Sequence, residues 1–544
     1  MQSLPGLLNQ RIYDVTGIDP ELRPATKPQF GHFQSNVALR LGKTQGVNPR
    51  EMAAQIVEKL AVDDICQPPE IAGPGFINFR LRDEVLAGAV NELLADEALG
   101  IPQLEQPQRV VIDYSSPNVA KQMHVGHLRT TIIGDCFNRV LSATGDEVIA
   151  QNHIGDWGRQ FGMLIEQIGD EALDVDSLDL AGAEQLYLRA NARLKEDEAF
   201  ADRARARVVK LQAGDEATLA TWRKLIAISL AGFNEIYARL GVLLTDEDIA
   251  GESFYNAMLA GIAEDLQARG IAVEDQGALV VFVDGFDAPA IIRNSAGGFG
   301  YDITDIAALK YRAEALGADR IIYVTDARQA NHFALVFAVA RKAGYLPENV
   351  TAEHVGYGMV LGKDGRPFQT REGTAVHLDD LLNQAEELAS PEVAIAAIKY
   401  ADLSSGLQKD YVFDAERMTQ TTGDTGPYLQ YAHARCAAIL RESEARGLAD
   451  GSVTQITEPA EQELALWLTR FGETVQAVAD ELTPHKLCGY LYELAGKYSV
   501  FYERCPVLKS EGEVQASRLT LVAATKAVLG RGLYLLGIPA PERM

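Results

Sequence analysis

The 544-residue sequence is poor in cysteine and has no long hydrophobic run. Its five cysteines form no CxxC pair, so neither a disulfide framework nor a zinc knuckle is indicated, and a reducing cytosol is the natural setting. No run of eighteen apolar residues is present, which argues against a membrane-spanning helix. The N-terminal stretch MQSLPGLLNQRIYD lacks the basic and apolar regions of a secretory signal. We therefore expect a cytoplasmic protein without a membrane partner.

Basic residues are also scarce. The chain has 50 Lys and Arg against 76 Asp and Glu, which gives a net charge of −26. Nonspecific nucleic-acid binding needs a basic surface, so this balance lowers the expectation of a nucleic-acid partner. It does not exclude one, because a chain of this length is expected to form several domains, and one of them can carry a local basic stripe. The sequence does not explain why the net charge is so negative.

The first and last parts of the chain differ in their patterns. Residues 1–107 combine a helical stretch at 49–61 with a strand-like segment at 73–81 and end in turn-forming residues, which predicts a small α/β domain. Residues 391–544 contain amphipathic or apolar helical stretches and few strand signals, which predicts an all-α domain.

The middle part, residues 108–390, begins with a strand–helix–strand pattern. RVVIDY (109–114) and EVIAQN (147–152) are typical of buried strands, and 128–145 has apolar residues at helical spacing. Such a βαβ unit requires parallel strands. Further strands are predicted for this part, and residues 170–230 are predicted to be a charged helical insertion. The added strands are expected at 277–283, 319–325 and 353–361. Together these patterns predict a doubly wound, Rossmann-like parallel sheet.

The stretch SSPNVAKQMHVGHLRTT (115–131) lies between the first predicted strand and its helix. Ligands of open α/β sheets bind beyond the carboxyl ends of the strands, where helix N-termini attract phosphate. Gly126 would let a ligand approach the backbone closely. On a first helical turn His124 and His127 would share a face and donate hydrogen bonds to phosphate oxygens, and Lys121 would add a positive charge. This combination suits a nucleoside triphosphate.

Two simpler interpretations of the histidines remain open. Both could merely cap the helix. They could also bind zinc, but HxxH lacks the i, i+4 spacing of the HExxH motif and no third ligand is evident. We therefore predict no metal site made by the protein.

The string HVGH (124–127) resembles the HIGH signature of class I aminoacyl-tRNA synthetases, and YSSPNVAKQMHVGHLRTTIIGD (114–135) resembles its form in the arginyl-tRNA synthetases. Further strings agree in family order over nearly the whole chain. They are FGHFQSNVALRLGK (30–43), GPGFINF (73–79), NHIGDWGRQFGMLI (152–165), GYDITDIAALKYR (300–312), YVTDARQANHF (323–333), YGMVLGKDGRPFQTREG (357–373), GPYLQYAHAR (426–435) and GLYLLGIPAPERM (532–544).

The resemblance implies an ATP-dependent enzyme that ligates L-arginine to its tRNA through an arginyl-adenylate, acting as a monomer. It implies that residues 108–390 form the catalytic domain, residues 391–544 an anticodon-binding bundle, and residues 1–107 an appended domain that contacts the tRNA. ATP would bring Mg²⁺ held by its phosphates and by water.

The same resemblance assigns site residues. Catalytic roles are implied for His124, His127 and Lys121. ATP contacts are implied for His124, Gly126, His127, Met359, Lys363 and Arg371. Arginine contacts are implied for Asp113, Ser116, Asn118, His124, Tyr301, Asp305 and Gln329. A planar guanidinium favours carboxylates, and Tyr301 and Asp305, four residues apart, would point the same way on a helix. Without the resemblance, each of these residues would be an ordinary surface or packing residue.

One string departs from the class I pattern. The loop GKDGRPFQTREG (362–373) stands where a KMSKS loop is expected, with Gln369 at the position of a lysine in many relatives. Arg371 is retained, and Lys121 matches a lysine thought to compensate in such enzymes. Lys363 or Arg366 could also supply charge. An ordinary surface hairpin is the alternative.

Contacts with tRNA are less evident from the sequence. The resemblance points to Phe33 and Asn36 in the N-terminal part and to Arg435, Lys486, Tyr498 and Arg504 in the helical part. Aromatic rings and Arg planes stack on unpaired bases, and Lys and Arg bind phosphates. Core packing and solvated helix faces are the alternatives for these residues.

Two other functions stay open. A paralogue could activate arginine for small-molecule metabolism, which Gln369 and the acidic charge mildly favour and the full-length tRNA-facing parts oppose. A tRNA-binding regulator with a decayed site is opposed by the intact His124, His127, Tyr301 and Asp305.

Overall fold

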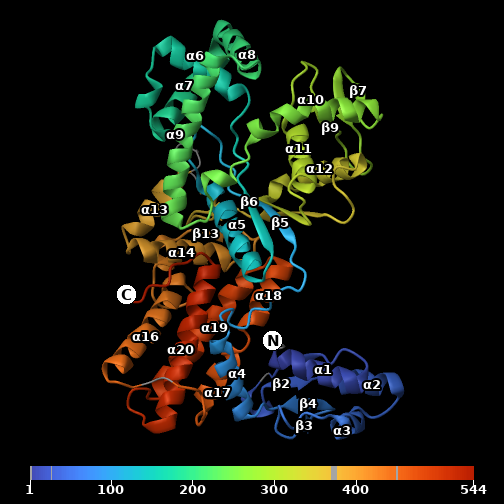
Figure 1. The fold of residues 1–544 in the computed structure, drawn as a ribbon, viewed down its shortest axis with the longest axis vertical. Coiled ribbons are helices and arrows are strands. Elements are labelled where there is room, and N and C mark those ends of the chain that lie inside the picture. Colours follow the sequence, from blue (N-terminus) through green and yellow to red (C-terminus); the bar gives the residue numbers. More distant parts are fainter. Residues whose placement is uncertain (1–2, 26, 369–375, 449–450) are drawn as a thin grey trace.

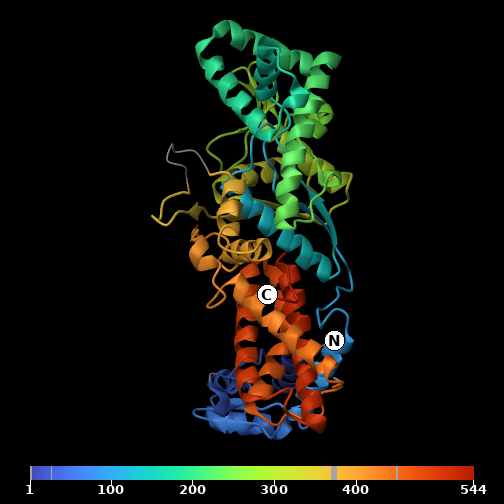
Figure 2. The ribbon, with the colours of Figure 1, turned by 90° about the vertical axis from the view of Figure 1, so that its left-hand side faces the viewer.

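The structure, a computed structural model, describes residues 3–25, 27–368, 376–448 and 451–544. Figures 1 and 2 show an elongated molecule. The N-terminal part lies at one end beside the C-terminal helices, the parallel sheet lies in the middle, and the helices of the insertion form the other end. The active-site candidates therefore lie between two largely helical regions.

The N-terminal part is a four-stranded antiparallel sheet, in the order β1-β2-β4-β3, with helices packed against it. Its last helix, α4, packs against the C-terminal helices α17 and α20 and so ties the two ends of the chain together. The elements are α1 (Leu4–Thr16), β1 (Leu22–Pro24), β2 (Phe33–Ser35), α2 (Val37–Gln45), α3 (Pro49–Lys59), β3 (Glu70–Ala72), β4 (Phe76–Phe79) and α4 (Asp83–Ala95).

The central sheet has the order β11-β10-β5-β6, and every neighbouring pair is parallel. The chain winds from β5 to β6 in one direction and from β10 to β11 in the other, so the direction changes between β5 and β10. Ligands bind at such a switch point. The prediction of a Rossmann-like parallel sheet is confirmed. Its elements are β5 (Arg109–Asp113), α5 (Val125–Ala143), β6 (Glu147–Gln151), β10 (Arg320–Asp326), α12 (Ala330–Ala343) and β11 (Thr351–Tyr357).

A long insertion separates β6 from β10. It begins with a helical group and continues with a helix-flanked antiparallel sheet, β7-β8-β9. The helical group is α6 (Arg159–Glu171), α7 (Leu180–Glu196), α8 (Glu198–Gln212) and α9 (Glu216–Leu240), and the rest is α10 (Glu252–Ala268), β7 (Val273–Asp275), β8 (Ala278–Val281), β9 (Ala290–Arg293) and α11 (Tyr301–Glu314).

The prediction that 277–283 contributes to the parallel sheet was wrong, because β8 belongs to this small antiparallel sheet. A short apolar run does not by itself distinguish the two kinds of strand. The overlooked signal is the turn before it, where Gln276 and Gly277 both have positive φ (48° and 81°) and connect β7 to β8 as a tight hairpin.

The predicted strand 353–361 is interrupted. β11 ends at Tyr357, and β12 (Val360–Leu361) pairs with β13 (Tyr411–Val412) instead. At Gly358 a Cβ would lie 2.6 Å from Oδ1 of Asp410, which accepts a hydrogen bond from the Met359 N–H (2.6 Å). The close approach of this segment breaks the strand and turns Met359 toward the surface.

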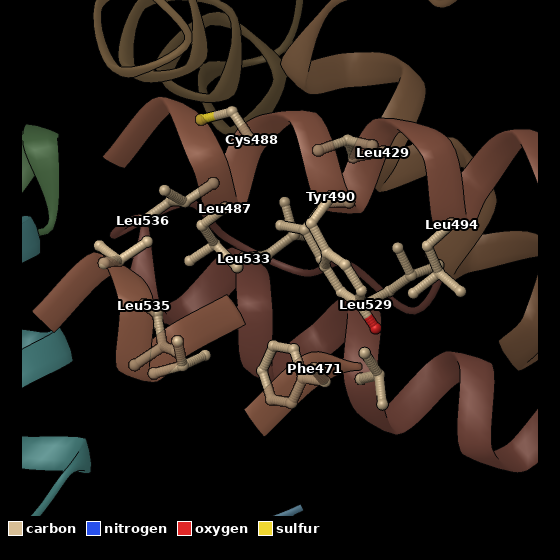
Figure 3. Close-up of a cluster of buried hydrophobic side chains, with 14 of the residues drawn as sticks. Leu429, Phe471, Leu487, Cys488, Tyr490, Leu494, Leu529, Leu533, Leu535 and Leu536 are labelled. Atoms are coloured by element: carbon tan, nitrogen blue, oxygen red, sulfur yellow. The ribbon is translucent and has the colours of Figure 1, made fainter. Parts of the chain in front are cut away.

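The C-terminal part is helical. Figure 3 shows its buried core, where leucines from α16, α19 and α20 pack with Phe471 and Tyr490. α14 packs against both α5 and the bundle, so it joins the sheet domain to the bundle. The helices are α13 (Leu378–Glu386), α14 (Pro391–Leu403), α15 (Ala415–Met418), α16 (Gly426–Ala445), α17 (Pro459–Leu468), α18 (Phe471–Glu481), α19 (Pro484–Arg504) and α20 (Gly512–Leu535). Within the described ranges no helix is long and apolar enough to cross a membrane.

Candidate functional site

The loop between β5 and α5 is strained. Ser115, Ser116 and Ala120 have positive φ (73°, 47° and 59°), a region that residues with a side chain avoid. Non-glycine residues persist there only where the surroundings fix them, and such strain concentrates at functional sites.

Hydrogen bonds from three elements fix this loop. The Ser115 N–H donates to Oγ1 of Thr130 (3.0 Å), and the Ser116 N–H donates to Oδ1 of Asn152 (3.0 Å). The Ala120 N–H donates to Oγ of Ser229 on α9 (2.9 Å). The loop shape therefore depends on the insertion as well as on the sheet.

Tyr237, also on α9, completes the support. Its buried hydroxyl lies 2.7 Å from Oγ of Ser115 and accepts a hydrogen bond from Nδ2 of Asn152 (3.0 Å). Burial raises the pKa of Tyr237 to about 12, so the hydroxyl keeps its proton.

The two signature histidines cap α5. The helix begins at Val125, three residues earlier than predicted, so His124 is the N-cap residue and not part of the first turn. Nδ1 of His124 accepts a hydrogen bond from the Gly126 N–H (3.0 Å), and Nδ1 of His127 accepts one from the His124 N–H (3.1 Å). The capping interpretation is thus correct, but it involves only Nδ1.

This capping fixes the tautomer of both rings. A neutral imidazole whose Nδ1 is an acceptor carries its proton on Nε2. Burial, followed by the charges of His124 and Lys121, lowers the pKa of His127 to about 3. Burial also lowers the pKa of His124. The rings lie 3.9 Å apart between centroids, so the site offers two adjacent neutral Nε2–H donors.

Helix α7 contacts both Lys121 and the segment before α13. Nζ of Lys121 lies 4.3 Å from the ring centre of Tyr187, a cation–π contact. One turn away, Oε2 of Glu184 accepts a hydrogen bond from Nε2 of Gln122 (3.0 Å) and lies 3.2 Å from Nε2 of His377.

The segment that follows the predicted KMSKS-like loop pairs with the signature itself. The Val125 N–H donates to the Val376 carbonyl (2.9 Å), and the Leu378 N–H donates to the Met123 carbonyl (2.8 Å). Gln369 and Arg371 lie outside the described residues. Lys363 is exposed and lies 3.1 Å from both Asp414 and Glu416, so its charge is balanced by the helical part.

The predicted arginine-binding pair lies at the start of α11. Tyr301 is the first helical residue and is 69% exposed. Oδ2 of Asp305 lies 2.6 Å from Nε2 of His332 on α12, and Nδ1 of the same imidazole lies 3.4 Å from Oδ1 of Asp302. The Tyr301 and His332 rings are 5.1 Å apart.

Sequence reasoning missed Glu252 and His332. Burial, assisted by the charges of Asp156 and Asp305, raises the pKa of Glu252 to about 7. Two positions in the sequence could have drawn attention to them. Glu252 is the first residue of α10, directly after Gly251, and His332 comes three residues after the candidate Gln329. Asp302, Asp305, Glu252 and His332 form one cluster, and its carboxylates favour the binding of a cation.

Asp113 is already paired. Its Oδ2 accepts a hydrogen bond from Nη2 of the fully buried Arg312 (2.7 Å), and its Oδ1 accepts one from Oγ of Ser116 (2.9 Å). Burial raises the pKa of Tyr323, and the charges of Asp113 and Asp305 add to this rise, so both carboxylates act electrostatically on the same tyrosine. Arg312 could not be found from the sequence, because it looks like an ordinary helical arginine.

The remaining candidates lie along the carboxyl edge of the sheet. Asn118 is exposed. A Cβ atom added at Gly155 would lie 2.5 Å from Oδ1 of Asn118, so only glycine fits beside this side chain. Gln329 is exposed at the start of α12, directly after β10. Gly126 is exposed, and Met359 follows β11. The structure thus gathers the predicted residues from three strand ends.

The residues predicted to contact tRNA divide into exposed and buried. Arg435 lies over the rings of Tyr431 (4.6 Å) and Tyr502 (4.9 Å), which are 42% and 45% exposed. Tyr498 is fully buried, which contradicts its prediction as a stacking surface; the exposed rings beside it are those of Tyr431 and Tyr502.

Of the other four, Phe33 lies in the N-terminal core, as its packing alternative predicts, and Asn36 precedes α2. Lys486 pairs with Glu481 (2.5 Å), and Arg504 is exposed at the end of α19. Helical periodicity alone could not separate the inward from the outward faces here.

No cluster of three or more metal-ligating side chains occurs in the part of the chain that the structure describes.

Comparison with known proteins agrees with this geometry. Residues 89–415 match the family described as "tRNA synthetases class I (R), catalytic domain", 429–544 match the "DALR anticodon binding domain", and 3–81 match the "Arginyl tRNA synthetase N terminal domain".

The chain is similar to curated relatives and to solved structures over nearly their whole length. The arginine–tRNA ligase of Cutibacterium acnes is 65% identical over the whole of both chains, and that of Thermobifida fusca is 49% identical over 97% of this chain and 95% of the relative. The arginyl-tRNA synthetase structure from Plasmodium falciparum has a TM-score of 0.83 at 28% identity and covers both chains completely. That from Thermus thermophilus has a TM-score of 0.82 at 26% identity, over 99% of this chain and all of the other. This chain belongs to the arginyl-tRNA synthetase family of class I.

Proposed function

We propose that the chain ligates L-arginine to its tRNA in two steps. A carboxylate oxygen of arginine attacks the α-phosphorus of ATP, and the bond to the β-phosphate breaks to release pyrophosphate. A terminal ribose hydroxyl of the tRNA then attacks the arginyl carbonyl, and AMP leaves. The observation that carries this proposal is the pair of neutral Nε2–H donors at the switch point of the sheet, together with the carboxylates around His332 at the start of α11.

At the ATP end, His124 and His127 would donate hydrogen bonds to phosphate oxygens. These hydrogen bonds would become stronger in the transition state. Because both rings are held neutral, positive charge has to come from other groups, which include Lys121 and the Mg²⁺ carried by ATP. Gly126 would let the phosphates approach the helix N-terminus. Met359, Lys363 and Arg371 complete the proposed ATP contacts.

At the arginine end, Tyr301 and Asp305 would bind the guanidinium, with Glu252 as a further acid. Asn118 and Gln329 would bind the α-amino and carboxylate groups, with His124 and Ser116 in the same wall. Asp113 would act through its bonds to Ser116 and Arg312, which fix the end of β5.

On the tRNA side, the exposed rings of Tyr431 and Tyr502, held by Arg435, suit stacking with unpaired bases. Asn36, Lys486 and Arg504 are the proposed polar contacts. We also propose that the chain acts as a cytoplasmic monomer, divided functionally into residues 1–107, 108–390 and 391–544. Its five free cysteines are typical of a reducing compartment.

The test is ATP–pyrophosphate exchange with arginine, with and without total tRNA, beside a lysine control. Exchange that requires arginine and tRNA supports the ligase. Arginine-dependent exchange without tRNA keeps the activation chemistry and points to the small-molecule paralogue. No exchange from folded protein under either condition overturns the enzyme assignment.

A further inference from the structure

His332 occupies a position that a substrate guanidinium would need. Its Nε2 lies 2.6 Å from Oδ2 of Asp305, and its Nδ1 lies 3.4 Å from Oδ1 of Asp302. The ring also meets Tyr301 edge-on. A cationic side chain between two carboxylates and beside a tyrosine reproduces the surroundings expected for the guanidinium of arginine.

The oxygens of Asp305 cannot serve both cations in the same way. A guanidinium binds a carboxylate most strongly when its two parallel N–H groups engage both oxygens. His332 already takes Oδ2, while Oδ1 has no hydrogen-bond partner among the described residues. A guanidinium that takes both oxygens for itself therefore needs His332 to release Oδ2.

We propose, on the basis of the proposed function, that His332 holds the guanidinium site in the free enzyme, and that arginine displaces it as a neutral imidazole with release of one proton to solvent. Charge balances in this exchange. The imidazolium on Asp305 is replaced by the guanidinium, and the proton from His332 leaves.

Once arginine binds Asp305, the surroundings of His332 favour loss of the imidazolium proton. His332 lies in the first turn of α12, where the helix dipole opposes a positive charge. Phe333 on its own helix is apolar, and His354 from β11, whose pKa is lowered by burial, supplies no negative charge. Among the described residues, the carboxylates paired with His332 are Asp302 and Asp305 of α11, and Glu252 of α10 acts on Asp305. Asp302 also accepts a hydrogen bond from the Ile291 N–H (2.7 Å).

The protonation state in the free enzyme agrees with this geometry. Burial opposes the charge, but hydrogen bonds to Asp302 and Asp305 outweigh it and raise the pKa of His332 to about 9. A guanidinium on Asp305 would remove the main cause of that rise and add a like charge nearby. The site would then admit a cation and reject neutral analogues such as citrulline, which cannot replace the imidazolium.

The first test is isothermal titration calorimetry of the full-length protein with L-arginine at pH 7.5, in phosphate and in Tris. These buffers differ in ionisation enthalpy, so the difference in binding heat counts released protons. We expect about one proton per arginine bound. Arginine binding without proton release overturns the exchange mechanism. Absence of arginine binding overturns the proposed function itself.

The second test compares two matched variants. His332→Asn replaces the ring with a neutral amide that cannot carry the proton, so we expect the proton release to fall close to zero. His354→Asn changes the neighbouring ring, which touches neither carboxylate of α11, and should release as many protons as the wild type. Retention of the release in His332→Asn assigns the proton to another group and overturns the proposal.

The pH dependence gives a third readout on the same proteins. Between pH 7 and 8.5 the arginine affinity of the wild type should rise by up to about tenfold per pH unit, because competition from the imidazolium decreases. His332→Asn should lose this rise. The α-amino group of arginine titrates at higher pH and affects all variants equally, so an equal slope in both proteins contradicts the exchange.

Discussion

The two ends of the site use histidines in opposite ways. At the ATP end, His124 and His127 accept backbone N–H groups at Nδ1 and are kept neutral by burial. At the arginine end, His332 has a carboxylate near each ring nitrogen and is kept charged. The same side chain is thus a neutral donor for an anionic substrate and a replaceable cation for a cationic one. The partner of each ring nitrogen determines which role it has.

The largest effect should come from removing the charge of the arginine end. Asp305→Asn leaves a guanidinium without its carboxylate, and loss of one partner of such a pair costs about 2–5 kcal/mol. We expect the kcat/KM for arginine to fall about 100-fold or more in pyrophosphate exchange with tRNA present. Asp287→Asn, the same change at an exposed loop position of the same insertion, is the control. Activity of Asp305→Asn within a few fold of the wild type would refute the guanidinium site.

At the ATP end, two variants of His127 separate capping from catalysis. Asn can reproduce the Nδ1 acceptor but not the Nε2 donor, so His127→Asn should fold normally and lose about 100-fold in kcat. Gln can place a donor near Nε2 but not the cap, so His127→Gln should keep more activity and lose about 1 kcal/mol of stability. Urea unfolding and exchange kinetics of both variants measure the two effects. The reverse pattern would show that the ring acts only as a cap.

Stability should respond to pH in opposite directions at the two ends. The folded pKa of His332, about 9, exceeds its usual 6.5, so its stabilisation is complete below about pH 6.5 and is lost as the pH rises through 9. The folded pKa of His127, about 3, lies below 6.5, so stability is lost as the pH falls from 6.5 toward 3. Between pH 5 and pH 9.5 each effect should be about 2–3 kcal/mol.

Unfolding free energies at pH 5, 7 and 9.5 measure both effects. His332→Asn should flatten the alkaline side only, and His127→Asn the acidic side only. If either variant flattens both sides, or neither side, the opposite charge states of the two ends are refuted.

The smallest effect should come from the support of Lys121. Tyr187→Leu removes the ring under Nζ, a contact that contributes about 0.5–1 kcal/mol, so we expect a two- to fivefold loss of kcat. Tyr187→Phe keeps the ring and should keep the activity. In a Lys121→Met background Tyr187→Leu should have no further effect. An undiminished loss in that background would mean that Tyr187 acts through another residue.

The sequence predicted the strand–loop–helix order around HVGH because buried parallel strands and an amphipathic helix have distinct patterns there. It also placed Asp113 correctly at the end of the first strand, where a buried apolar run meets the loop. Its proposed ligand role remains a prediction.

What the sequence could not supply were pairings between distant residues. Nothing in the pattern around Asp113 indicates Arg312, 199 positions away, and nothing around Asp305 indicates His332. The prediction for Tyr498 was wrong for a related reason. Helix α19 is apolar on much of its surface, so its periodicity did not show that this ring faces inward.

The strained loop 115–120 has a consequence for any attempt to shorten the protein. Its left-handed residues are held in part by Ser229 and Tyr237, which belong to the insertion and lie more than 100 positions away. An engineered minimal enzyme that lacks α9 would lose these bonds, and the loop would relax toward ordinary backbone angles. The insertion is therefore not a removable module, and a reduced design has to replace the two hydroxyl groups that α9 contributes.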